Sequence, residues 1–219
     1  MEKGPSSSDF EVDSRDLHLQ SKVRTLRAVD SARVATTALA LLMGITVLGV
    51  SANTLAVYDS THVPSDFLLS LWPDEFNIRP TISLVIGSVI IVLTNIIALC
   101  FSKVQSLRSK TVAHTSTTFA APLVGLAAAL IAIIFFYAVN ASEEVDTFLS
   151  WTCRWETVPM TVQPNWGTLC RQSRAGLYLA ILLIPVEAAA LGLAGFQLKV
   201  EKYASNYSSA ARKGSPTLS

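Results

Sequence analysis

Four long apolar stretches constrain this chain more than any other feature of its sequence. They cover residues 34–57, 81–101, 117–139 and 175–198. A hydrocarbon core about 30 Å thick requires roughly 20 apolar residues in a helix that rises 1.5 Å per residue. The first three stretches contain no Asp, Glu, Lys or Arg, whereas a soluble helix would carry a charged face. The sequence therefore predicts an all-α fold, an antiparallel four-helix transmembrane bundle.

The distribution of positive charge predicts how this bundle is oriented. Of the 17 Lys and Arg residues, thirteen lie before the first stretch, between the second and third, or after the fourth. By the positive-inside rule, both termini and the middle loop are cytosolic, and the loops 58–80 and 140–174 are outer loops. All four tryptophans fall in these outer loops, which favours the same orientation. We expect a multi-pass protein of the plasma membrane or a secretory-pathway membrane.

The ends of the chain differ in composition from the spans. Residues 1–16 are polar and acidic and predict a disordered cytosolic arm without an apolar signal, so the first span would direct insertion. The membrane domain is expected over residues 17–204, and a Ser-rich disordered tail over 205–219. From Leu17 onward, apolar residues recur at helical spacing among basic ones. This segment is either a cytosolic extension of the first helix or an interfacial segment attracted to anionic lipid.

Two cysteines lie in the second outer loop, Cys153 and Cys170, with sixteen residues between them. An extracytosolic compartment permits oxidation, so we predict a disulfide that stabilises the loop by about 3 kcal/mol. The alternatives are two free thiols or a metal-binding pair, although the loop has no His to complete a zinc site.

Three further positions in or near the loops invite an interpretation. Cys100, at the cytosolic end of the second span, is either a small core residue or a palmitoylation site. Asn140 begins a glycosylation sequon beside the third span, where we expect poor occupancy because the bilayer is so close. The run 66–72 predicts either a short interfacial helix anchored by Trp72 or a loop packed on the bundle.

The fourth stretch contains one ionisable side chain near its centre, Glu187, two positions after Pro185. A charge at the bilayer centre costs about 2.5–3.5 kcal/mol on insertion scales. We expect a mostly protonated carboxyl group that faces the bundle interior, because no Lys or Arg lies at that depth. Counted from the midpoints of the stretches, the nearest polar groups at its level are Thr46, Ser88 and Asn95.

Two roles for Glu187 follow from this position. In the structural role, the carboxyl group hydrogen-bonds one of those three residues and holds the fourth helix against the first two. In the functional role, it relays protons or ions. A relay needs further titratable groups at depth, and the three histidines lie outside the apolar stretches. The structural role is therefore the favoured interpretation.

Small residues recur at a spacing of four within two of the spans. Ala40 with Gly44, and Ala188 with Gly192, form small-xxx-small pairs that allow helix backbones to approach closely. Such a pair serves either packing within the bundle or self-association between copies in the membrane.

The four-span architecture, the basic entry to the first span and the Cys153–Cys170 pair in the second outer loop resemble MARVEL-type tetraspan proteins. The resemblance covers about residues 25–205, and it implies a membrane bundle that acts in membrane apposition, vesicle trafficking or lateral membrane organisation. Tetraspanins fit less well because their Cys-Cys-Gly motif is absent, and claudin-like proteins because their cysteines lie in the first outer loop.

The sequence offers no motif for catalysis, for a cofactor or metal, or for nucleic-acid binding. We expect a non-enzymatic organiser of membrane domains or trafficking, with lipids and other membrane proteins or copies of itself as partners. The alternatives are a small transporter or channel subunit that uses Glu187, and an outer-loop adhesion or ligand-binding module. The organiser predicts a dry bundle, the transporter a water-accessible cavity at Glu187, and the adhesion module an exposed patch of tryptophans.

Overall fold

Long helices dominate the computed structural model, which describes residues 14–62, 71–103, 111–142 and 145–213. The four long helices are α1 (Ser14–Thr61), α2 (Arg79–Lys103), α4 (Thr111–Ser142) and α6 (Trp166–Lys213). Each contains one of the predicted spans and is long and apolar enough to cross a membrane. The fold is thus essentially all-α, and its four apolar helices indicate a multi-pass integral membrane protein.

The helices extend well beyond the apolar stretches. The segment from Leu17 is continuous with α1, which begins at Ser14 within the predicted arm. At the other end, α6 continues to Lys213, so residues 205–213 are helical where the sequence predicted a disordered tail. Apolar residues end where the lipid is expected to end, whereas a helix of good helix formers such as Ala and Lys can continue past that point. Residues 1–13 and 214–219 lie outside the described residues.

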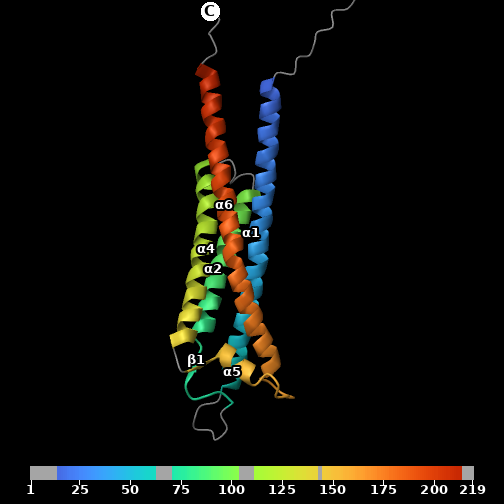
Figure 1. Cartoon of the computed structure of the whole chain (residues 1–219), viewed down its shortest axis with the longest axis vertical. Helices are drawn as coiled ribbons and strands as arrows, with labels where there is room; N and C mark the ends of the chain where they lie inside the picture. The colour runs from blue at the N-terminus through green and yellow to red at the C-terminus, as the bar shows by residue number, and fades with distance from the viewer. Residues whose placement is uncertain (1–13, 63–70, 104–110, 143–144, 214–219) are drawn as a thin grey trace, which may run out of the picture.

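Four helix pairs form the main interfaces of the bundle. α1 packs against α2 and α6, and α4 packs against the same two helices. The cyclic order is therefore α1, α2, α4, α6, and α2 lies diagonally across from α6. Figure 1 shows the start of α1 and the end of α6 together at one end of the molecule, with β1 and α5 at the other end.

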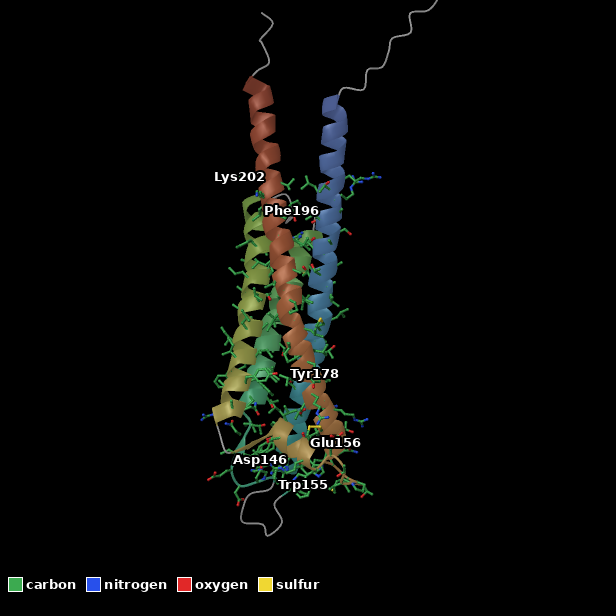
Figure 2. All side chains as sticks on the ribbon, in the orientation of Figure 1. Asp146, Trp155, Glu156, Tyr178, Phe196 and Lys202 are labelled. Atoms are coloured by element: carbon green, nitrogen blue, oxygen red, sulfur yellow. A yellow bond between two sulfur atoms is a disulfide. The ribbon has the colours of Figure 1, made fainter. Side chains whose placement is uncertain are left out.

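Small and aliphatic side chains fill the core between these helices, including Ala40, Val47, Ile91, Ala129 and Leu183. The outer faces are also apolar, as the exposed side chains of Leu42, Ile131 and Ile134 illustrate. Polar and charged groups gather at the ends, where Asp146 and Glu156 lie at one end and Lys202 toward the other (Figure 2). An apolar face on both the inside and the outside is what a bundle surrounded by lipid requires.

The end that carries β1 and α5 holds a cluster of aromatic rings, which we call the aromatic cap. Its members are Tyr58, Trp72, Phe76, Phe148 and Trp166. Trp72 contacts the other four rings at centroid distances of 5.0–5.6 Å, and only 1% of it is exposed. Its Nε1 donates a hydrogen bond of 3.0 Å to Thr61 Oγ1. Trp72 is therefore packed on the bundle and is not an exposed interfacial anchor; residues 63–70 lie outside the described residues.

Two short strands join the loop before α2 to the loop after α4. β1 (Phe76–Asn77) pairs in parallel with β2 (Asp146–Thr147), with Phe76 opposite Asp146. The short helix α5 (Phe148–Arg154) follows β2 directly, and Thr147 caps it by accepting a hydrogen bond from the Ser150 backbone N–H. These two-residue strands are the one departure from the predicted all-α fold within the described residues. They place Phe76 and Phe148 in ring contact at 4.9 Å.

Candidate functional site at the centre of the bundle

Glu187 is completely buried in the middle of α6, with 0% of its surface exposed. It shares a helix face with Leu183, Ala190 and Ala194, which are also buried. These positions follow the spacing of three and four residues that lies along one side of a helix. Pro185 lies on the exposed side of the same helix, which continues through it. The carboxyl group therefore points toward the centre of the bundle.

The partner of Glu187 is Asn95 on α2, the helix that lies diagonally opposite. Asn95 Nδ2 donates a hydrogen bond of 2.8 Å to Glu187 Oε1, and a second of 2.9 Å to the Ile91 carbonyl oxygen of its own helix. Asn95 is itself 4% exposed. The Glu187–Asn95 bond thus runs through the interior of the bundle and connects two helices that otherwise make few contacts.

The other two polar residues expected at this depth do not reach Glu187. Thr46 lies on the exposed face of α1, and its hydroxyl donates to the Leu42 carbonyl oxygen at 2.9 Å. Ser88 is buried, but its hydroxyl donates to the Val85 carbonyl oxygen of its own helix at 2.9 Å. Depth alone selects three candidates, whereas rotation about each helix axis decides which side chain faces the carboxyl group.

Gly125 on α4 forms the wall against which the carboxyl group packs. A methyl group at this position would lie 2.8 Å from Glu187 Cδ, Oε1 and Oε2. Any larger residue would force the carboxyl group or the helix to move, so the glycine gives the buried acid its present position. Reasoning from the sequence missed Gly125, although a glycine at the depth of an intramembrane acid in a neighbouring span is a signal that could have identified it.

The surroundings of Glu187 are closely packed. An apolar cavity of about 10 Å³ lies beside Gly87, Ser88 and Leu183, and a partly polar cavity of the same size lies beside Ser51 and Thr54. Each has about the size of a single water probe, and Glu187 lines neither. Oε2 has no hydrogen-bond partner among the described residues. Within the described residues, the Glu187 carboxyl group is thus fully buried.

A second buried polar contact involves Arg33, in the N-terminal half of α1. Its guanidinium group pairs with Asp30 at 2.9 Å and donates to Thr118 Oγ1 on α4 at 3.1 Å and to Ser102 Oγ on α2 at 3.4 Å. Only 6% of Arg33 is exposed. The sequence placed Arg33 among the charges that set orientation, whereas the structure makes it a link between three helices.

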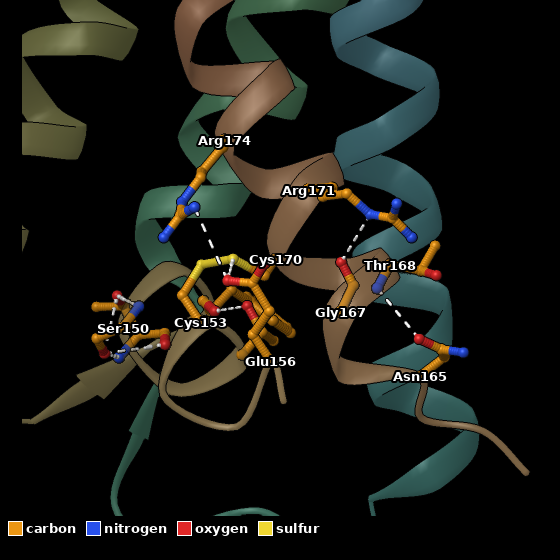
Figure 3. The surroundings of a disulfide bond; sticks show 12 residues. Ser150, Cys153, Glu156, Asn165, Gly167, Thr168, Cys170, Arg171 and Arg174 are labelled. Carbon is orange, nitrogen blue, oxygen red and sulfur yellow. Dashed lines mark hydrogen bonds and ion pairs between the residues drawn. A yellow bond between two sulfur atoms is a disulfide. The ribbon is translucent and has the colours of Figure 1, made fainter. Parts of the chain in front are cut away.

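The predicted disulfide is present between Cys153 of α5 and Cys170 of α6, with Cα atoms 4.8 Å apart. Glu156 lies beside it, with Oε2 3.4 Å from Cys170 Sγ and 3.8 Å from Arg174 Nη1 (Figure 3). The sulfur of a disulfide has no proton to donate, so the first of these is a van der Waals contact. Cys153, Glu156 and Cys170 would be near enough to hold a metal ion. The disulfide occupies both sulfur atoms, and the cluster is therefore not a metal site.

The two candidate modification sites have different surroundings. Cys100 is a free, exposed cysteine, so it is not the small core residue of the first interpretation, and its thiol is accessible to acylation. Both the nitrogen and the oxygen of the Asn140 side-chain amide form hydrogen bonds. Nδ2 donates to the Phe136 carbonyl oxygen at 2.8 Å, and Oδ1 accepts from the Thr147 hydroxyl at 2.8 Å. Glycosylation would modify Nδ2, the atom that donates to the Phe136 carbonyl oxygen.

Comparison with known proteins identifies no relative: no family model, no curated protein and no solved structure matches the chain.

Proposed function

We propose that this chain is a non-enzymatic tetraspan protein that organises membrane domains or takes part in trafficking. In this proposal α1, α2, α4 and α6 cross the membrane in alternating directions, with both termini in the cytosol and the aromatic cap outside. Two features support that orientation: the positive-inside distribution of Lys and Arg, and the disulfide, which an extracytosolic compartment favours. The architecture resembles that of MARVEL-type proteins.

The observation that carries the proposal is the sealed carboxyl group of Glu187. An acid that moves protons or ions needs a polar path to water. Glu187 is instead fully buried, bonded to Asn95 and packed against Gly125. This arrangement favours a structural role over transport, because the Glu187–Asn95 bond joins the two diagonal helices and the carboxyl group is not exposed to water.

The tryptophans of the outer loops give little support to an adhesion module. Trp72 and Trp166 are 1% and 5% exposed because they belong to the aromatic cap. Trp151 is half-buried, and Trp155 is the one with substantial exposure. An adhesion surface built on aromatic anchors needs several exposed rings side by side, and the described outer loops bury most of theirs.

One of the two small-xxx-small pairs is buried in the bundle and the other is exposed on α6. The exposed pair supports self-association through α6. Ala40 and Gly44 are buried, and Gly44 packs against Ile91 and Val92 of α2. Ala188 and Gly192 lie on the exposed face of α6, and a methyl group at Gly192 would meet nothing within 4 Å. We therefore assign the first pair to the bundle and the second to contacts between copies or with other membrane proteins.

Reconstitution tests the choice between organiser and transporter. Liposomes that contain the protein are expected to conduct protons and alkali cations no faster than protein-free liposomes, and Glu187→Gln should change nothing. A flux that depends on the protein and is lost in Glu187→Gln would overturn the proposal, because a carboxamide cannot carry a proton.

Fluorescence energy transfer between labelled copies in the same liposomes tests self-association. Gly192→Leu should lower the transfer by covering the close-approach surface of α6. Gly49→Leu is the matched control, since Gly49 is also exposed and also has nothing within 4 Å of an added methyl group. Equal transfer in both variants and the parent would count against the α6 interface.

A further inference from the structure

A groove of about 370 Å³ runs along the outer surface of the bundle between α2 and α4. Its floor is made by small residues, Gly87, Ala128 and Ala132, and its sides by Ile86, Ile131 and Phe135. A methyl group at Gly87 would lie 2.7 Å from Ala132 Cβ, so the two helices are in close contact beneath the groove. The volume falls within the range of roughly 300–1,000 Å³ that is typical of small-molecule sites.

The length of the groove matches one leaflet of a bilayer. Along α2 its lining extends from Arg79 to Ile90, which is about 16 Å of helix at 1.5 Å per residue. Half of a hydrocarbon core about 30 Å thick is about 15 Å. Arg79 is the first residue of α2, at the cap end of the molecule, so the groove starts at that interface and ends near mid-membrane.

Arg79 gives one end of this apolar groove a positive charge. It is exposed, and the ion pairs of the described residues involve Arg33, Arg154 and Arg174 but not Arg79. Asp74 and Glu75, exposed in the same loop, form no ion pair with it in this part of the chain. An apolar channel of one leaflet's depth with a cation at the headgroup level is complementary to a phosphate group attached to a hydrocarbon chain.

From this geometry we propose that the α2–α4 groove binds a glycerophospholipid of the outer leaflet. One acyl chain lies over Gly87, Ala128 and Ala132, and the phosphate group pairs with the Arg79 guanidinium group. The inference rests on the proposed orientation in the membrane and names a lipid partner for it. It does not depend on self-association through α6, which lies outside the groove.

Photolabelling in nanodiscs tests the site. The probe is a trace of phosphatidylglycerol, an anionic glycerophospholipid, with a diazirine near the end of one acyl chain, in a phosphatidylcholine nanodisc. Label is expected to concentrate at the mid-membrane end of the groove, on residues 86–90 and 128–131. Arg79→Gln should reduce it there by about fivefold, the effect of losing one cation near a headgroup. Arg171→Gln, which alters an exposed arginine at the same end on α6, should leave it unchanged.

Two further experiments test separately the role of the phosphate group and the role of the groove. A diacylglycerol with the same photoreactive chain lacks the phosphate group, so it should label the groove of the parent protein as weakly as the phospholipid labels Arg79→Gln. Ile90→Trp, which narrows the groove, should also reduce labelling, whereas Ile45→Trp on the exposed face of α1 should not.

The outcomes that contradict the proposal are distinct from one another. Equal labelling of all four helices, insensitive to Arg79→Gln, would show that the groove is ordinary lipid contact. Crosslinks in the groove to a second copy would show that it is a protein interface. The absence of label on every helix would contradict the membrane-spanning arrangement itself.

Discussion

The cap end of the molecule gathers five aromatic rings and a disulfide, whereas its middle buries a carboxyl group, an amide and a glycine. Both regions join helices that are distant in sequence. In the cap, Trp72 reaches Trp166 and Phe148 through large ring contacts. In the middle, Glu187 reaches Asn95 through a single hydrogen bond between small and aliphatic neighbours.

This difference corresponds to the two solvents that the proposed arrangement implies. Where water surrounds the protein, burial of large apolar rings is itself a driving force. Where lipid surrounds it, the tails are as apolar as the side chains, so close packing and polar contacts between helices must supply the specificity. A substitution in the aromatic cap should therefore cost more unfolding free energy than one at the centre. At the centre, the cost should depend mainly on whether the new side chain fits the space.

The largest expected effect is in the cap, at Trp72. Trp72→Ala removes a ring that is 1% exposed, together with its hydrogen bond to Thr61, and should lower the free energy of unfolding by about 3–5 kcal/mol. Chemical unfolding in detergent, followed by circular dichroism, measures it. Trp155→Ala is the control, because 41% of Trp155 is exposed and its loss should cost no more than about 0.5 kcal/mol. Equal losses of unfolding free energy in the two variants would contradict the expectation that the buried Trp72 stabilises the fold more than the exposed Trp155.

The disulfide should come next. Replacement of Cys153 and Cys170 by serine is expected to cost about 3 kcal/mol, because the reduced chain gains freedom in the unfolded state. Reductant should destabilise the parent protein by a similar amount. Cys100→Ser, which alters the exposed free thiol, should have no such effect. A parent protein that unfolds identically with and without reductant would contradict the expectation.

At the centre of the bundle, we expect a steric effect on stability when Gly125 is enlarged. Gly125→Ala places a methyl group 2.8 Å from the Glu187 carboxyl group and should cost about 1–3 kcal/mol of unfolding free energy. Gly49→Ala, in an open position on α1, should leave stability unchanged or raise it by up to about 1 kcal/mol through helix propensity. The same unfolding assay applies, and a tolerated Gly125→Ala would mean that the carboxyl group has more room than the contacts indicate.

The smallest effect is expected for Glu187→Gln. The carboxamide has nearly the same shape, and its oxygen can still accept the hydrogen bond from Asn95 Nδ2. Since hydrogen bonds between membrane helices average only about 0.6 kcal/mol, the change in unfolding free energy should stay below about 1 kcal/mol. A loss as large as that of Gly125→Ala would show that a carboxylate charge, and not a neutral hydrogen bond, holds the centre together.

The sequence was sufficient to predict the spans, because an uncharged apolar run of about 20 residues is typical of membrane-spanning helices and rare in soluble ones. It was less informative about where the helices end, since α6 continues to Lys213 after the apolar residues stop. It also predicted the disulfide, which is confirmed, because two cysteines in one outer loop leave few pairings.

The sequence could not select the partner of Glu187. Thr46, Ser88 and Asn95 are equivalent in depth, and an apolar span has no polar face from which to read its rotation. Gly125 and Arg33 were missed for the same reason, since their roles depend on which helices are neighbours. The burial of Trp72 and the pairing of β1 with β2 depend on how two loops meet in space, which no local pattern encodes.

A double-mutant cycle between Gly125→Ala and Glu187→Ala tests most directly that the buried acid organises the centre of the bundle. Glu187→Ala removes the carboxyl group that the new methyl group would meet. We expect the cost of Gly125→Ala, about 1–3 kcal/mol in the parent protein, to fall close to zero in the Glu187→Ala background. The same cost in both backgrounds would contradict the account, because Gly125 would then be accommodating something other than Glu187.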